Sequence, residues 1–376
     1  MKPKIIIALN TAWNLHNFRT GLIRGLIDEG FEVIAVAPID DYGHKLAGIG
    51  CRYISLPMEN HGMNPGTDLQ LFLGYLRILK AERPSVFLGY TIKPNIYGSL
   101  AAHLLGIPVI NNITGLGRAF AGNRWLSMFV SALYRMSLFP SAKVFFQNEE
   151  DRDEFLARRL VRPDKTGRLP GSGIDLQKFA FEPLPSRHAG RFRFLLLARM
   201  LWEKGVGVYV DAARLVKERY PDADCCLLGF VDGKEAGAIS ALQMEQWVDE
   251  GIVRFLGHSD DVRSELCEAD CVVLPSYYKE GVPKSLLEAA AMGRPIITTD
   301  TTGCREVVDE GVSGYLCRPH DARHLAEKMM AMLSLSPEEL SSMGKAGREK
   351  VAREFDERLV IGRYRDAIYC ILKNIC

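Results

Sequence analysis

The sequence predicts an α/β protein of two doubly wound domains, each with a parallel sheet between layers of helices. Short apolar runs alternate with helical segments in both halves of the chain, as is typical of parallel strands joined by crossover helices. A chain of 376 residues is also long for one hydrophobic core and suits two. The expected linker is the segment 181–190, which contains two prolines and mixed charges.

Apolar runs in each half are interpreted as strands. In the first half they are 4–9, 32–37, 52–56, 86–90, 109–112 and 143–147, and in the second half 192–198, 225–229, 253–256, 271–275, 296–298 and 315–317. Helices are expected between them, for example 20–29 closed by Gly30 and 68–83 closed by Pro84, and the tail 337–376 is expected to be helical. Such domains bind ligands at the carboxyl ends of their strands, so the cleft between the two domains is the default site.

Composition is that of an ordinary globular protein, with 25% charged and 47% hydrophobic residues. The first apolar run is too short for a signal peptide, and no stretch reaches the about 18 uncharged apolar residues of a membrane span. Nine cysteines include no C-x-x-C pair, so we expect structural thiols in a reducing, cytoplasmic compartment. The net charge of +1 and the absence of a recognisable motif argue against nucleic-acid binding.

The segment 277–293 carries two glutamates, Glu280 and Glu288, around the predicted start of a helix capped by Ser285. Amide groups at a helix start favour a phosphate, whereas carboxylates accept hydrogen bonds from sugar hydroxyls. One acid on each side of a phosphate-binding site suits a nucleoside diphosphate sugar, because one carboxylate can bind the ribose and the other the hexose. A second turn contains Arg199, Lys204 and Gly205. A guanidinium and an ammonium there could neutralise a leaving diphosphate, or form an ordinary solvated turn.

Together these segments resemble the retaining glycosyltransferases of family 4. Glu280 and Glu288 match the E-x7-E motif of that family, 199–205 matches its Arg-x4-Lys-Gly segment, and 171–175 is similar to its interdomain loop. The resemblance implies the GT-B fold, in which two Rossmann-like domains face each other across a cleft and the C-terminal helix crosses back to the N-terminal domain. The implied domains are 1–182 with about 355–376, which binds the acceptor, and 190–354, which binds the donor.

The resemblance also implies roles for individual residues. Arg199, Lys204 and Glu280 would be catalytic, and Glu288 would bind the ribose, although an exposed helix residue is the alternative for it. Further donor contacts are expected from main-chain groups or walls of the nucleobase pocket, namely Gly281, Val282, Pro283, Ser285, Gly229 and His258. Retention in the family proceeds by front-face displacement on a UDP-sugar. The acidic pairs Asp40-Asp41 and Asp260-Asp261 do not match a D-x-D metal motif at a strand end, and Arg199 and Lys204 would do the work of a metal, so we expect no cofactor and no metal.

In the N-terminal half, the segment 10–21 looks like the pattern Trp-x3-Asn-Phe-Arg of the subgroup that acts on lipid-linked bacterial glycans, and it is expected to be a loop facing the cleft. Its candidate residues are Asn14, His16 and Arg19. His16 could be a base, or it could have a packing or surface role. After later strands come Lys93, which could meet an acceptor phosphate or be a surface lysine, and Thr114, near the place where many family members have a histidine. Gly173 of the interdomain loop completes the acceptor and cleft set.

The segment 118–143 interleaves basic and aromatic residues within a stretch that has no acid between Glu82 and Glu149. This pattern suits a helix in an anionic membrane interface, or a helix packed on the sheet. Residues 1–180 hold 21 Lys and Arg against 15 Asp and Glu, and the remainder 26 against 31. We therefore expect a cytoplasmic protein peripherally bound to the inner face of the cytoplasmic membrane. The family resemblance implies that it passes a hexose or N-acetylhexosamine from a UDP-sugar to a polyprenyl-diphosphate-linked saccharide in the synthesis of a surface polysaccharide or glycan. A nucleotide-sugar 2-epimerase and an inactive nucleotide-sugar-binding subunit are the alternatives.

Overall fold

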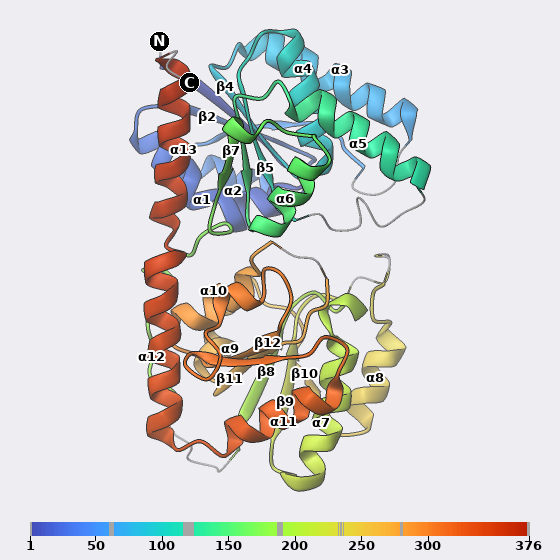
Figure 1. The fold of residues 1–376 in the computed structure, drawn as a ribbon, viewed down its shortest axis with the longest axis vertical. Coiled ribbons are helices and arrows are strands. Elements are labelled where there is room, and N and C mark those ends of the chain that lie inside the picture. Colours follow the sequence, from blue (N-terminus) through green and yellow to red (C-terminus); the bar gives the residue numbers. More distant parts are fainter. Residues whose placement is uncertain are drawn as a thin grey trace. The chain divides into compact units, whose positions relative to one another are not determined.

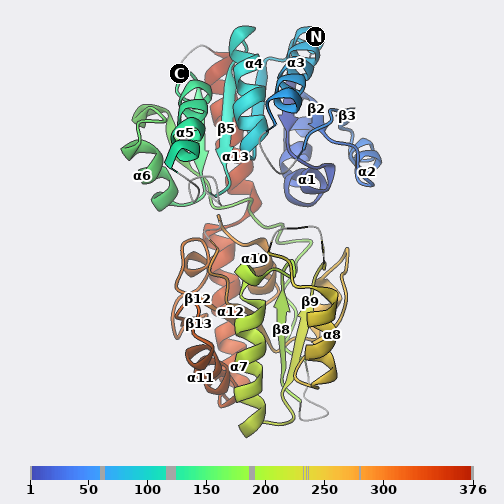
Figure 2. The same cartoon turned by 90° about the vertical axis from the view of Figure 1, so that its right-hand side faces the viewer.

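The computed structural model describes residues 2–59, 64–115, 124–185, 191–231, 233, 235, 237–278 and 281–373. The chain divides into two compact units, and the elements of each are shown in Figures 1 and 2. Unit 1 comprises Met1–Ser172 and Glu357–Cys376, and unit 2 comprises Gly173–Asp356. No helix in the described part of the chain is long and apolar enough to span a membrane.

Unit 1 is built on a seven-stranded parallel sheet of order β3-β2-β1-β4-β5-β6-β7. Its strands are β1 Lys4–Ala8, β2 Glu32–Ala37, β3 Arg52–Ser55, β4 Val86–Tyr90, β5 Val109–Ile113, β6 Lys143–Phe146 and β7 Thr166–Arg168. Its helices are α1 Ala12–Asp28, α2 Gly43–Ala47, α3 Pro65–Glu82, η1 Pro94–Gly98, α4 Ser99–Leu104, α5 Arg124–Leu138, α6 Glu149–Ala157, η2 Pro163–Lys165 and α13 Glu357–Leu372. Every strand predicted in the first half is present. The short β7 was not predicted because three residues give no alternation to detect.

The predicted loop at 10–21 is wrong, because α1 begins at Ala12. Thr11 caps the helix, since its hydroxyl accepts a hydrogen bond from the Asn14 amide at 3.0 Å. Asp40, which follows β2, accepts a second bond from the Trp13 amide at 2.9 Å. These two caps satisfy backbone amides of the first turn, and one of the two acceptors is a residue distant in the sequence.

The C-terminal helix α13 packs against α1 in unit 1, as expected for the GT-B fold (Figure 1). Two glycines of α1 make room for it: a methyl group on Gly21 would overlap the Glu357 carboxylate, and one on Gly25 would overlap Ile361. Tyr364 of α13 is fully buried in the core beneath the sheet. The prediction that the chain end crosses back to the N-terminal domain is confirmed.

Unit 2 is built on a six-stranded parallel sheet of order β10-β9-β8-β11-β12-β13. Its strands are β8 Arg193–Leu197, β9 Asp224–Leu228, β10 Arg254–Phe255, β11 Cys271–Leu274, β12 Ile296–Thr299 and β13 Gly314–Cys317. Its helices are η3 Trp202–Lys204, α7 Val206–Arg219, α8 Ala241–Asp249, α9 Arg263–Cys267, α10 Lys284–Ala291, η4 Arg305–Val307, α11 Ala322–Leu333 and α12 Pro337–Glu354. Two sheets of parallel strands with crossover helices agree with the predicted fold class.

The chain passes into unit 2 at Gly173 rather than at the predicted boundary of 182. Ile174 and Phe179 are buried in the core of unit 2, and the Glu182 amide donates to the Met292 carbonyl at 3.3 Å. The fully buried Arg294 guanidinium donates to carbonyl groups of this same segment, including that of Pro183 at 2.8 Å. Residues 173–183 are therefore fixed to unit 2 by packing and by hydrogen bonds.

Candidate active site

In unit 2, the turn after β8 and the segment after β11 are held together. Gly205 has φ of +76°, and a methyl group on it would lie 2.1 Å from the Pro275 carbonyl oxygen. The Tyr277 amide donates to the Glu203 carbonyl at 3.1 Å, and the Ser276 hydroxyl donates to the same carbonyl at 3.3 Å. Since β8 and β11 are neighbours in the sheet, two segments singled out separately in the sequence form one surface at its carboxyl edge.

The two basic side chains of this turn lie at that edge. The Arg199 side chain is 58% exposed and forms an ion pair with Glu235. The Lys204 ammonium lies 5.9 Å from the centroid of the Tyr278 ring. Exposed ion pairs are weak, so a surface guanidinium can exchange its carboxylate partner for a phosphate at little cost.

Helix α10 follows this surface and begins at Lys284, two residues earlier than predicted. Pro283 is its N-cap, with φ of −63° and ψ of 121°, so the prediction of Ser285 as the cap is wrong. Proline at this position keeps the chain extended and has no amide hydrogen to satisfy, which leaves Ser285 inside the first turn. Gly281 and Val282 are buried beside it. Glu280 lies outside the described residues.

Glu288 lies one turn inside α10 and is half-buried. Burial raises the pKa of Glu288 to about 7, although the positive charges of Lys284 and Lys178 oppose the shift. The carboxyl group therefore titrates near neutral pH. Because the carboxyl group is costly to charge in the free protein, a ligand that donates hydrogen bonds to it stabilises the carboxylate form.

Phe230 and His258 form an exposed aromatic pair after β9 and β10. Their ring centroids are 5.6 Å apart in an edge-to-face arrangement, and Phe230 is 56% exposed. Gly229 has a packing role, because a methyl group on it would lie 1.7 Å from the Ala198 carbonyl oxygen. Its amide donates to the Gly257 carbonyl at 2.8 Å. The aromatic faces, rather than the glycine amide, are thus available to a planar ligand.

A stacked pair beside the turn was not singled out from the sequence. The Tyr277 and His320 rings lie 3.8 Å apart between centroids, although 43 positions separate them in the sequence. His320 has φ of +59°, which is uncommon for a residue with a side chain. Only the fold brings these two residues together, and the sequence has no signal for the pair.

In unit 1, the candidates Asn14 and His16 of α1 contact residues outside that helix. The side-chain amide of Asn14 donates a hydrogen bond to the side-chain oxygen of Asn10 at 2.9 Å. The His16 ring packs on Tyr42, with 5.6 Å between ring centroids. The packing role considered for His16 is therefore present. Arg19, the third candidate, is buried, with its guanidinium carbon 4.4 Å from the centroid of the Tyr90 ring.

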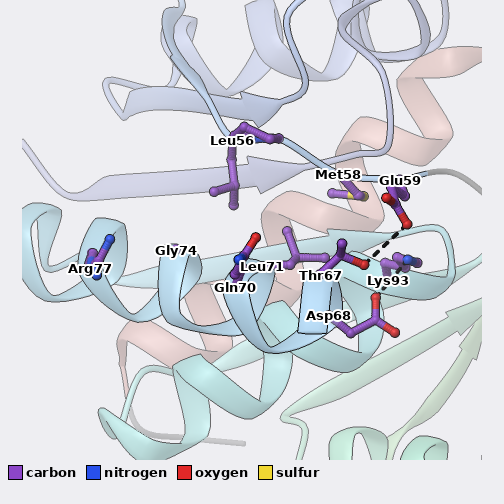
Figure 3. A pocket seen from close by; sticks show the side chains of 11 residues that line it. Leu56, Met58, Glu59, Thr67, Asp68, Gln70, Leu71, Gly74, Arg77 and Lys93 are labelled. Carbon is purple, nitrogen blue, oxygen red and sulfur yellow. Dashed lines mark hydrogen bonds and ion pairs between the residues drawn. The ribbon is translucent and has the colours of Figure 1, made fainter. Parts of the chain in front are cut away.

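Lys93 lines a cavity of 650 Å³ between α3 and the segment after β3 (Figure 3). Its ammonium lies 2.7 Å from Asp68, and both side chains are mostly buried. The Tyr97 hydroxyl donates to the second Asp68 oxygen at 2.8 Å. Lys93 is therefore neither a simple surface lysine nor an unpaired cation, and a phosphate would have to compete with Asp68 for it.

The remaining candidates lie at chain junctions. Thr114 directly follows β5 and is half-buried. Gly173 has φ of +74° and is the first residue of unit 2. Its neighbour Ile174 donates its amide to the Phe355 carbonyl at 2.8 Å, next to the point where the chain returns to unit 1. Gly173 thus lies where the two connections between the units meet.

Two family models match the chain in sequence. The model "Glycosyl transferase 4-like domain" matches residues 16–171, and the model "Glycosyl transferases group 1" matches residues 191–334. The matches fall on unit 1 and unit 2 respectively. The chain is a glycosyltransferase of the GT-B fold.

Several known proteins are similar to this glycosyltransferase. The N,N'-diacetylbacillosaminyl-diphospho-undecaprenol alpha-1,3-N-acetylgalactosaminyltransferase of Campylobacter jejuni is 28% identical over 96% of this chain and 97% of its own length. The UDP-Gal:alpha-D-GlcNAc-diphosphoundecaprenol alpha-1,3-galactosyltransferase of Escherichia coli is 23% identical over 82% of this chain and 81% of its own length.

Solved structures share the fold. A glycosyltransferase from Rickettsia africae superposes with a TM-score of 0.81 at 17% identity, and the match covers 99% of both chains. Anabaena Alr3699/HepE in complex with UDP-glucose superposes with a TM-score of 0.80 at 16% identity, over 97% of this chain and 99% of that one.

One aspartate of each acidic pair has a structural role. Asp40 caps α1, as described above, and Asp261 forms an ion pair with Arg263. Within the described ranges, no group of three or more His, Cys, Asp or Glu side chains is arranged to hold a metal ion.

The raised pKa of Glu288 predicts a pH-dependent affinity for UDP. If the carboxylate accepts hydrogen bonds from ribose hydroxyls, the protonated form must lose its proton on binding. With a pKa of about 7, UDP should bind up to about 30-fold more tightly near pH 8 than near pH 5.5. Isothermal titration calorimetry at both pH values measures this change.

The variant Glu288→Gln is the control. The terminal phosphate of UDP itself titrates at about pH 6, so the variant should keep that part of the pH dependence and lose only the part due to Glu288. Equal pH dependence of UDP affinity in the parent and in Glu288→Gln would contradict the ribose contact.

The stability of the free protein provides a second test. The pKa of Glu288 is raised in the folded state, so the charged form destabilises the fold as pH rises from about 4.5 to about 7. Glu288→Gln should therefore gain stability over the parent at pH 8 and lose that advantage below pH 4.5.

Proposed function

We propose that this glycosyltransferase transfers a hexose or N-acetylhexosamine, with retention, from a UDP-sugar to a polyprenyl-diphosphate-linked saccharide. The observation that carries the donor half is the joined surface at the carboxyl edge of unit 2. It presents Arg199 and Lys204 beside the start of α10, with Glu288 one turn further on. Amides and cations favour a diphosphate there, and a carboxylate favours hydroxyl groups.

The acceptor half of the proposal is supported by the two relatives, whose names specify saccharides linked to diphospho-undecaprenol. The more similar of these two aligns over nearly the full length of both chains. Unit 1 is the proposed acceptor domain, since the donor groups are assigned to unit 2.

The proposed reaction is a front-face displacement. The acceptor hydroxyl oxygen bonds to the anomeric carbon as the bond from that carbon to the UDP phosphate oxygen breaks. The leaving phosphate oxygen takes both the electron pair of that bond and the hydroxyl proton. Arg199 and Lys204 stabilise the charge that develops on the diphosphate, and Glu280 aligns the sugar. We propose that no metal is required, so turnover should be unchanged by a chelator.

The proposed membrane surface lies on unit 1. Helix α5 buries Val130, Tyr134 and Leu138 against the core, and yet its other side is also apolar. Met128, Phe129, Met136 and Phe139 are between 42% and 61% exposed.

Helices α3, α4 and α5 lie side by side over one part of unit 1 (Figures 1 and 2). Leu104 at the end of the neighbouring helix α4 is 71% exposed. Exposed apolar groups that gather in one region are typical of docking sites, and the basic residues of this region favour anionic lipids.

We expect the double variant Met128→Ser, Phe129→Ser to bind anionic vesicles at least about 10-fold more weakly, because each large apolar side chain contributes about 1.5–3 kcal/mol when buried. Co-sedimentation with phosphatidylglycerol vesicles measures the loss. Leu242→Ser is the matched control, since Leu242 is 66% exposed on α8 of unit 2. Equal vesicle binding by the parent and the double variant would exclude this surface.

The function is tested by UDP release from a panel of UDP-sugars, with and without a polyprenyl-diphosphate-linked saccharide. Release from one donor only in the presence of the acceptor supports the proposal and identifies the sugar. Release without acceptor would indicate hydrolysis, and conversion of the donor without UDP release would indicate epimerisation. UDP binding without any turnover would instead favour an inactive nucleotide-sugar-binding subunit.

A further inference from the structure

Among the described residues, one positive charge is buried in unit 1 without an acid to balance it. Arg19 is only 4% exposed, it forms no ion pair with these residues, and its Nε and Nη1 atoms are buried with no hydrogen-bond partner among them. Its guanidinium carbon lies over the face of the Tyr90 ring, 4.4 Å from the ring centroid. A cation–π contact offsets part of the desolvation cost of a guanidinium, but it does not neutralise the charge.

Other buried polar atoms around Arg19 also lack partners. Among the described residues, the buried Tyr90 hydroxyl and the buried Asn112 side-chain oxygen have no partner in hydrogen-bonding geometry, although the Tyr364 hydroxyl is a neighbour of the Tyr90 hydroxyl. The Asn112 amide nitrogen donates to the Tyr364 hydroxyl at 2.8 Å. This bond orients the Asn112 side chain and leaves its oxygen available. Buried polar groups are nearly always paired in folded proteins, so three such groups in one cluster indicate a ligand site.

The cluster lies at the edge of the sheet where ligands bind in this class of fold. Tyr90 is the last residue of β4, and Asn112 is the last but one of β5. Helical side chains lean toward the N-terminus of their helix, so Arg19 reaches from α1 toward the carboxyl edge. Thr91, directly after Tyr90, has φ of +57°. A β-branched residue in this conformation is strained, as is common at functional sites.

The available atoms define the chemistry of the ligand. Arg19 offers two nitrogen donors and Tyr90 a hydroxyl donor, whereas the Asn112 oxygen can only accept. Burial, followed by the neighbouring Tyr364, raises the pKa of Tyr90 well above its usual value, so its hydroxyl keeps its proton. An anionic oxygen that lies near a hydroxyl or amide N–H group satisfies all three residues. A water molecule could supply hydrogen bonds, but it could not supply the missing negative charge.

We propose that Arg19, Tyr90 and Asn112 bind a phosphate oxygen of a sugar diphosphate, with a neighbouring sugar hydroxyl or amide group placed on Asn112. This inference rests on the proposed function, which supplies two such molecules: the lipid-linked acceptor and the UDP-sugar donor. Both carry a phosphate next to a sugar, and the kinetics of variants separate the two sources.

The test compares Arg19→Met with the parent protein in two measurements. The first is the melting temperature of the free protein, which should be unchanged or higher in the variant, because removing an unbalanced buried charge removes its desolvation cost.

The second measurement is the rate of UDP release as the concentration of each substrate is varied. The KM for one substrate should rise by at least about 10-fold, as expected for the loss of a charge-assisted hydrogen bond. A rise for the acceptor, with unchanged UDP affinity by calorimetry, assigns the phosphate to the lipid-linked saccharide. A rise for the donor, with weaker UDP binding, assigns it to UDP.

Two further variants sharpen the test. Tyr90→Phe removes only the unpartnered hydroxyl, so it should raise the same KM several-fold without lowering the melting temperature. Arg24→Met replaces an exposed arginine on the same helix and should change neither quantity. A fall in melting temperature for Arg19→Met and Tyr90→Phe with both KM values unchanged would overturn the proposal and leave a structural cluster. Failure of the proposed function is distinguishable, because the parent would then show no acceptor-dependent UDP release at all.

Discussion

Replacement of Lys204 by alanine is expected to lower the rate of sugar transfer by about a thousandfold without unfolding the protein. Lys204 lies at the carboxyl edge of unit 2, near the Tyr278 ring and next to Gly205. Loss of one group that stabilises developing charge typically costs about 10²–10³ in rate, or about 3–4 kcal/mol. Steady-state UDP release at saturating donor measures the effect. Circular dichroism and the melting temperature should remain those of the parent, since Lys204 is only half-buried, at the end of a short turn.

Arg199→Ala should show a similar but smaller loss, because in the free protein this guanidinium is already shared with Glu235. Glu280→Ala should also remove turnover if the sugar contact implied by the family motif is present. Lys345→Ala is the matched control, since Lys345 is an exposed lysine on α12 of the same unit. Normal rates in Lys204→Ala, Arg199→Ala and Glu280→Ala together would exclude the proposed donor site.

The fold class could be predicted because a parallel sheet leaves a strong local signal. Runs such as Ile5–Ile7 and Val272–Val273 are fully buried on both faces of their sheets, and such strands read as continuous apolar stretches. Helix starts were harder to predict. The start of α1 depends on Asp40, which is 27 positions away from Trp13. The cap of α10 was misplaced because Ser285 is a good N-cap by type, whereas Pro283 fixes the extended backbone that the turn requires.

The candidate site could be predicted only in its residue types and spacing. The motifs predict that Arg199, Lys204 and Glu288 form one site, but what surrounds each of them depends on packing. Burial sets the pKa of Glu288, and the pairing of Lys93 with Asp68 joins residues 25 positions apart. The unbalanced charge of Arg19 depends on β4 and β5 as well as on α1. Such properties belong to the folded molecule, and no local pattern encodes them.

The glycine that closes the donor turn provides the second large expected effect. Gly205→Ala places a methyl group 2.1 Å from the Pro275 carbonyl oxygen, on a backbone with φ of +76°. Backbone strain alone should cost about 1–3 kcal/mol. The clash is with backbone and cannot be relieved by a side-chain movement, so the turn must move away from the segment after β11. We therefore expect a melting temperature several degrees lower and a loss of turnover of at least about 100-fold, because misplaced charges no longer match the diphosphate.

The variant Gly251→Ala separates the effect of backbone strain from the effect of the clash with the Pro275 carbonyl oxygen. Gly251 has φ of +70°, in the same unit, but a methyl group there would meet nothing within 4 Å. This variant carries the backbone strain without the clash, so it should lose stability yet keep full activity. The difference between the variants measures how far catalysis depends on contact between the turn and Pro275. If Gly205→Ala and Gly251→Ala were equally stable and equally active, that contact would not hold Arg199 and Lys204 in place, and their alignment would have to come from the bound donor.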